Sequence, residues 1–244
     1  MSPSKRDGAG AISLAQLSLP VGLSASASLH NYVVGPNAEA VSGVEDFAAG
    51  VGSRLLHLWG RPGTGKTHLA HAVCRRQIDT GVPAAYVPLS DRQLSPKLLE
   101  NLAAVAVICL DDVHLIAGNA EWERALFRFY NETENQPSRL LLTSDRRVDG
   151  LGLVLGDLAS RLSSALGFQL RELDDTCREQ VFRSRAQEHG FVISDEVVDY
   201  VMRRHSREMS DLIELIERLD RSTLEAGRRV TVPFVKSLLN SGDF

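Results

Sequence analysis

Short apolar runs recur along the chain and alternate with segments whose apolar residues have helical spacing. Each run has a length typical of a strand, and the runs cover 54–59, 84–89, 105–110, 139–144 and 167–173. The run at 105–110 (VAVICL) contains no polar position, which is typical of a strand that is buried on both faces of a sheet. Strands that alternate with helices favour an α/β fold with a parallel sheet sandwiched by helices.

One helical pattern precedes the first run, at 37–50, and three lie between runs, at 66–79, 95–102 and 121–135. In the last of them, Trp122, Leu126 and Phe129 recur at helical spacing and predict an amphipathic helix. Ser95 and Pro96 are typical cap and first-turn residues, so we expect the third helix to start there.

The pattern changes after Leu173, where helical segments follow one another without a strand between them. They lie at 175–189, 194–204, 207–226 and 233–240. The sequence therefore predicts a flexible leader over 1–29, an α/β domain over 30–173 and a small all-α domain over 174–244.

Composition narrows the range of functions. The 244 residues carry a net charge of −4, so the basic excess of a duplex-binding domain is missing and we expect no direct, sequence-specific DNA binding. The three cysteines form no C-x-x-C pair, which argues against a disulfide framework and favours a cytoplasmic protein. No segment has the apolar length of a membrane span.

The strongest motif lies between the first strand and the helix that follows it. Residues 60–67 read GRPGTGKT and match G-x-x-x-x-G-K-[ST], the P-loop that binds nucleotide phosphates. Lys66 is expected to reach the β- and γ-phosphates, and the Thr67 hydroxyl is expected to ligate Mg²⁺. Backbone N–H groups cradle the phosphates. The cradle residues are Gly60, Pro62, Gly63, Thr64 and Gly65.

Carboxylates follow two of the predicted strands. Asp111 and Asp112 come directly after the buried run, where Asp111 suits a magnesium ligand and Asp112 suits a base that orients the attacking water. Asp145 is the last residue of the T-S-D sequence that ends the fourth strand, which suits a sensor of the γ-phosphate. The alternative for each of them is local stabilisation of a loop.

These motifs together resemble the AAA+ family, in its DnaA-related branch, and most of all the Hda group of DnaA inactivators. The likeness covers roughly 30–241 and includes LLLTSDR, DLASRL and REM. It implies that Arg161 is an arginine finger, that Arg207 is a second sensor reaching the phosphates from a helical lid, and that Val33, Val34 and Gly35 line the adenine pocket. Without the resemblance, the arginines suit surface positions and the small apolar residues suit packing.

The leader carries Gln16-Leu17-Ser18-Leu19-Pro20, which resembles the peptide that binds the sliding clamp of DNA polymerase. Leu17 and Leu19 suit apolar pockets, Gln16 suits polar groups in a groove, and Pro20 restrains the extended chain. The alternative is an accidental string in a flexible tail.

The resemblance implies a negative regulator of replication initiation. Such a protein docks on the DNA-loaded clamp, binds ADP or ATP with Mg²⁺, and stimulates hydrolysis of the ATP held by DnaA. Self-association is expected from the family. Because Asp112 is one methylene shorter than the glutamate of many AAA+ motors, we expect weak intrinsic ATPase activity. A helicase loader of the DnaC type and an autonomous ATPase remain alternatives.

Overall fold

The computed structural model describes residues 23, 24, 26–102, 104–134, 136–204, 206, 208–226 and 230–240. The predicted clamp-binding motif at 16–20 and the predicted sensor Arg207 lie outside the described residues.

Five parallel strands form one sheet in the order β2-β3-β4-β1-β5. The strands are β1 (Leu55–Trp59), β2 (Ala84–Pro88), β3 (Val107–Asp111), β4 (Arg139–Ser144) and β5 (Leu166–Gln169). The prediction of a parallel sheet is confirmed. Since all strands run the same way, their carboxyl ends meet at one edge, and this edge carries the P-loop and the acidic residues.

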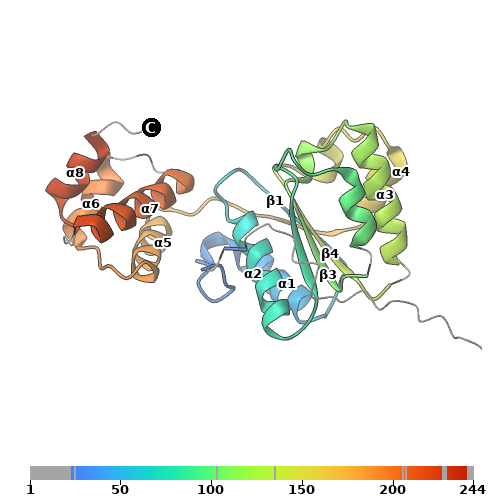
Figure 1. The fold of residues 1–244 in the computed structure, drawn as a ribbon, viewed down its shortest axis with the longest axis horizontal. Helices are drawn as coiled ribbons and strands as arrows, with labels where there is room; N and C mark the ends of the chain where they lie inside the picture. Colours follow the sequence, from blue (N-terminus) through green and yellow to red (C-terminus); the bar gives the residue numbers. More distant parts are fainter. Residues whose placement is uncertain are drawn as a thin grey trace, which may run out of the picture.

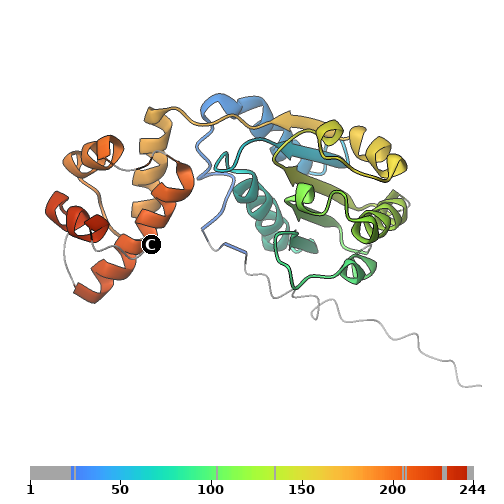
Figure 2. The same cartoon turned by 90° about the horizontal axis from the view of Figure 1, so that it is seen from above.

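Helices cover both faces of this sheet (Figures 1 and 2). Leu56 and Leu58 of β1 pack with α1 (Ala38–Ala48) and α2 (Lys66–Asp79). Leu55, on the other face of the same strand, packs with α3 (Ala120–Glu134) and α4 (Gly156–Ser163). The alternation of side chains along β1 therefore separates the P-loop helix α2 from α4.

The C-terminal part forms a second, all-helical body with its own core, at the opposite end of the molecule from α4 (Figure 1). Its helices are α5 (Asp175–Glu188), α6 (Asp195–Arg204), α7 (Met209–Ala226) and α8 (Val232–Asn240). Asp174 begins α5 by accepting a hydrogen bond from the N–H of Cys177 at 2.8 Å. This body is the helical lid that the sequence predicts.

Most predicted elements are shifted by a residue or two at their ends, and two differ more from the structure. The segment after Ser95 is a 3₁₀-helix, η3 (Pro96–Asn101), and within the described part of the chain the Ser95 side chain does not cap it. β5 ends at Gln169 instead of continuing to 173, because the N–H and carbonyl of Arg171 bond to the side-chain amide of Asn37 at 2.7 and 3.0 Å. The chain there leaves the sheet toward the lid.

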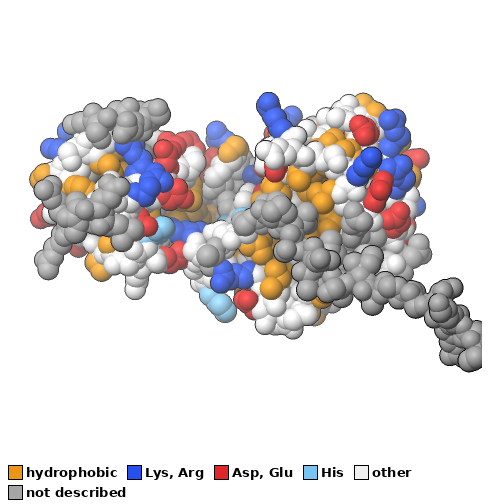
Figure 3. Space-filling model, viewed as in Figure 1, with side chains coloured by type: hydrophobic (Ala, Val, Ile, Leu, Met, Phe, Trp, Pro, Cys, Tyr) orange, Lys and Arg blue, Asp and Glu red, His pale blue; other side chains and the backbone are white. Residues whose placement is uncertain are grey.

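Charged side chains of both signs are interspersed on the face seen in Figure 3, over the lid as well as the α/β domain. Among the described residues no helix is both long enough and apolar enough to cross a membrane.

Candidate nucleotide-binding site

The P-loop joins β1 to α2, and its glycines have conformations and neighbours that exclude side chains. Gly63 and Gly65 have φ angles of 78° and 91°, in the left-handed region. A Cβ at Gly60 would lie 2.4 Å from the carbonyl oxygen of Leu170, and one at Gly65 would lie 2.6 Å from the Tyr32 ring. Because Gly65 is the N-cap of α2 and has no side chain to cap it, the first N–H groups of the helix suit an anion.

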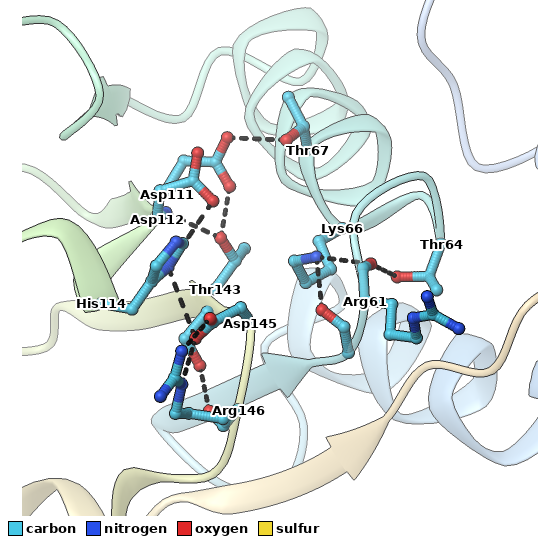
Figure 4. A network of polar contacts seen from close by, with 12 residues as sticks. Arg61, Thr64, Lys66, Thr67, Asp111, Asp112, His114, Thr143, Asp145 and Arg146 are labelled. Carbon is cyan, nitrogen blue, oxygen red and sulfur yellow. Dashed lines mark hydrogen bonds and ion pairs between the residues drawn. The ribbon is translucent and has the colours of Figure 1, made fainter. Parts of the chain in front are cut away.

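Lys66 is buried at the start of α2, with its ammonium inside the loop. Its Nζ donates to the carbonyl oxygens of Gly60 at 2.7 Å and Arg61 at 2.9 Å (Figure 4). Burial lowers the pKa of Lys66, and the nearby carboxylates of Asp112 and Asp111 oppose that shift. The Lys66 amino group thus lies inside the loop whose N–H groups suit phosphate.

Asp111 is 2% exposed and accepts hydrogen bonds from three hydroxyl groups. Thr67 and Tyr86 donate to Oδ2 at 2.8 and 2.7 Å, and Thr143 donates to Oδ1. Burial and the Asp111 charge raise the pKa of Tyr86, which keeps it a donor. The pair of Thr67 and Asp111 fits Mg²⁺, an ion that takes few protein oxygens and keeps several waters.

Asp112 has φ 61° and ψ 46°, a left-handed conformation that aspartate tolerates better than most residues. Its N–H donates to the Thr143 hydroxyl at 2.9 Å, which fixes the turn after β3. Burial, followed by the charge of Asp111, raises the pKa of Asp112. A carboxylate with a raised pKa is a stronger base once ionised, which suits the orientation of water.

Asp145 lies at the end of β4 and is paired with its neighbour Arg146, at 2.9 Å from Nε and 2.6 Å from Nη2. This hydrogen bonding lowers the pKa of Asp145. His114 lies between the two carboxylates, with Nδ1 3.9 Å from Asp112 and 4.0 Å from Asp145 (Figure 4). The structure therefore adds Arg146 and His114 to the residues expected at this edge.

A crevice of about 70 Å³ separates the P-loop from the lid. Val33 lines it, whereas Val34 is 39% exposed and Gly35 packs beside Leu173 and Cys177. Several other residues that line the crevice were not predicted from the sequence. Some of them belong to the lid, so their place in the crevice depends on how the two domains pack together. These lining residues are His68, Leu173, Val181, Arg185, Met209 and Ile213, which lie beside Tyr32 of the predicted adenine-pocket segment.

Arg161 lies near the end of α4, just before β5 begins. It is thus on the sheet face opposite α2 and near the edge where strands start, far from the molecule's own phosphate cradle. Its guanidinium pairs with Glu134 at 3.0 Å and lies 5.9 Å from the centre of the Tyr130 ring. The Arg161 side chain is 47% exposed.

The structure is similar to domain III of the replication initiation protein DnaA from Thermotoga maritima, with a TM-score of 0.77, 22% identity and coverage of 90% of this chain and 98% of that one. The family model of the "ATPase family associated with various cellular activities (AAA)" matches residues 56–170. The model "Hda, lid domain" matches residues 175–239. The chain is a DnaA-related, Hda-like AAA+ protein.

Other solved structures share the fold of this DnaA-related protein. AMPPCP-bound DnaA from Aquifex aeolicus has a TM-score of 0.67 and 23% identity, over 83% of this chain and 68% of that one. A RuvB mutant from Thermotoga maritima has a TM-score of 0.66 and 19% identity, over 88% and 72%. The predicted AAA+ fold with a helical lid is confirmed.

Proposed function

We propose that this protein is a negative regulator of replication initiation that acts on DnaA. It docks on the DNA-loaded sliding clamp through Gln16, Leu17, Leu19 and Pro20, and it binds adenine nucleotide, most favourably ADP, in its own P-loop. It then offers Arg161 to the ATP that DnaA holds. Hydrolysis of that ATP leaves DnaA inactive.

The observation that carries this proposal is the place of Arg161 in the fold, near the end of α4, on the sheet face opposite α2. The P-loop lies where the strands end, and Arg161 lies near the edge where they start, so we propose that the guanidinium serves a nucleotide held by another molecule. An arginine finger stabilises charge on the transferring phosphoryl group and contributes about 10³–10⁵ in rate. The pair with Glu134 does not oppose this role, since a surface ion pair contributes only about 0–1 kcal/mol.

The chain's own nucleotide has a separate role, which is to join the two domains. The amides of the P-loop and the Lys66 ammonium bind the diphosphate, and Thr67 and Asp111 hold Mg²⁺, which neutralises phosphate charge when bound. Asp145 and Arg207 complete the site from β4 and from the lid. Asp112 supports weak intrinsic hydrolysis.

The test is hydrolysis of ATP bound to DnaA in the presence of DNA-loaded clamp. Arg161→Ala is expected to reduce the stimulation at least about 10³-fold. The control is Arg128→Ala, which removes an exposed arginine from the neighbouring helix α3. This variant is expected to stimulate DnaA as the wild type does. Full stimulation by Arg161→Ala would exclude the finger role.

Docking on the clamp is tested separately with a variant that combines Leu17→Ala and Leu19→Ala. This variant is expected to lose binding to the loaded clamp and the stimulation that depends on it, whereas Arg161→Ala still binds the clamp. Unchanged clamp binding would contradict the docking role of the leader.

A further inference from the structure

Glu123 is a fully buried carboxylate in the first turns of α3, at 0% exposure. It accepts backbone hydrogen bonds from Gly118 at 2.7 Å and Val154 at 3.1 Å, both on Oε1, and from Leu155 at 2.7 Å on Oε2. A buried charge is costly unless hydrogen bonds compensate it, and three N–H donors do so here.

The three N–H groups belong to two segments that are far apart in the sequence. Gly118 lies in the loop that follows Asp112 and the short helix η4 (Val113–Leu115). Val154 and Leu155 lead into α4, and Leu155 is the N-cap of that helix. Glu123 therefore ties the loop after the acidic pair to the start of the helix that carries Arg161.

The Glu123 carboxylate lies at the N-terminal end of α4, where a negative charge is favourable. Leu155 has no polar side chain with which to cap the helix, and the first N–H groups of a helix form its positive end. The Glu123 carboxylate is held at this end by two adjacent N–H groups. It accepts a hydrogen bond from the N–H of the N-cap residue itself, as the glutamate of a capping box does, but from a neighbouring helix.

α3 also holds the other end of α4. Glu134, the last residue of α3, pairs with Arg161 at 3.0 Å. One helix thus supports α4 twice, through a buried contact at its start and an exposed contact near its end. The buried contact is the stronger constraint, because solvent weakens the exposed one.

We infer that Glu123 is a positioning residue, which fixes α4 and so the direction of Arg161 relative to the acidic end of β3. This inference rests on the proposed function of Arg161 for its catalytic consequence. The positioning itself is independent of that function and is measured separately.

The first experiment is hydrogen exchange of the Gly118, Val154 and Leu155 amides. All three are expected to exchange slowly in the wild-type protein, although they lie outside helices and strands. In Glu123→Gln an amide NH₂ replaces one acceptor oxygen, and their exchange is expected to accelerate by about ten- to a hundredfold, the equivalent of one charged hydrogen bond. Amides of β1 and β4 keep their rates.

Glu132→Gln is the matched control, because Glu132 is exposed on the same helix. It is expected to leave all these amides unchanged. Fast exchange of the three amides in the wild-type protein, or unchanged exchange in Glu123→Gln, would overturn the inference. If Glu123→Gln does not fold, Glu123→Asp retains the charge with a shorter reach, and the same acceleration is expected at Leu155.

The second experiment measures hydrolysis of DnaA-bound ATP against the concentration of this protein. Glu123→Gln is expected to lower the maximal rate by about tenfold or more, because small misplacement of a reacting group is costly. The half-saturating concentration and the protein's own nucleotide affinity stay unchanged, and Glu123→Asp gives an intermediate rate. A variant that only melts earlier, with a normal maximal rate, would refute the positioning role.

Failure of the proposed function gives a different result. In that case the wild-type protein and Arg161→Ala stimulate DnaA equally, while the exchange of the three amides still reports whether Glu123 holds α4.

Discussion

At the scale of single residues, His57 is a buried titratable group in the middle of β1. It is 3% exposed, and its Nε2 lies 2.6 Å from the Ser144 hydroxyl. Because Ser144 donates its own proton to the Arg146 carbonyl, His57 is the donor in this contact. Burial, and then the charge of Arg147, lowers the pKa of His57 from 6.5 to about 4.

This shift predicts a pH-dependent stability. Between pH 6.5 and pH 4 the unfolded chain binds a proton at His57 and the folded chain does not, so stability falls as the pH falls through that window. The contribution of this residue is on the order of 3 kcal/mol. Urea unfolding at pH 7 and pH 4.5 measures it.

His57→Gln provides the comparison, because His68 and His71 also have lowered pKa values and add to the wild-type slope. The variant is expected to lose less stability on acidification than the wild type does. Equal losses for the two proteins would show that His57 is not held neutral.

Asp111 shows what residue-level reasoning can and cannot recover from the sequence. Its place at the end of a wholly apolar run was enough to predict a carboxylate at the phosphate edge. Its contact with Tyr86 was not predictable, because it depends on β2 lying beside β3 in the sheet. Arg146 was noted only within LLLTSDR and His114 was not expected at the site, because the closeness of His114 to both carboxylates depends on β3 lying beside β4.

At the scale of elements, apolar patterning predicted the strands closely. The run at 139–144 and the helix at 66–79 have the observed bounds. The errors lie where a distant polar contact decides the end of an element, as the side chain of Asn37 does for β5. DLASRL was noted in the sequence for its arginine and not among the predicted helices. The support of helix α4 by Glu123 was not predictable either, because it requires three segments to meet.

At the scale of the whole molecule, a few polar contacts join the lid to the α/β domain. Arg185 of α5 donates to the Ser26 hydroxyl at 2.6 Å and lies 2.9 Å from Nδ1 of His68 on the P-loop helix. Glu188, from the same helix, accepts from the Asn31 side chain at 2.7 Å. The crevice between the domains measures about 70 Å³, below the roughly 300–1,000 Å³ of typical small-molecule sites.

Arg185→Ala is expected to loosen the lid. Loss of its contacts with Ser26 and His68 raises the open fraction by about tenfold, the equivalent of one or two hydrogen bonds. Distance distributions between spin labels at Glu39→Cys and Arg203→Cys measure the opening, with the partly exposed Cys177 replaced by serine.

Arg183→Ala is the control, because Arg183 pairs with Asp195 inside the lid at 2.7 Å. It is expected to keep the wild-type distribution. Identical distributions for Arg185→Ala and the wild type would mean that another contact holds the two domains together.

The proposed regulatory role depends on adenine nucleotide binding to the loop between β1 and α2. The most direct measurement is equilibrium binding of Mg·ADP to the wild-type protein, Lys66→Ala and Arg161→Ala. The wild type and Arg161→Ala are expected to bind equally, since α4 is remote from the loop, and Lys66→Ala to bind on the order of a hundredfold more weakly. Equal binding by Lys66→Ala, or no binding by the wild type, would contradict the account.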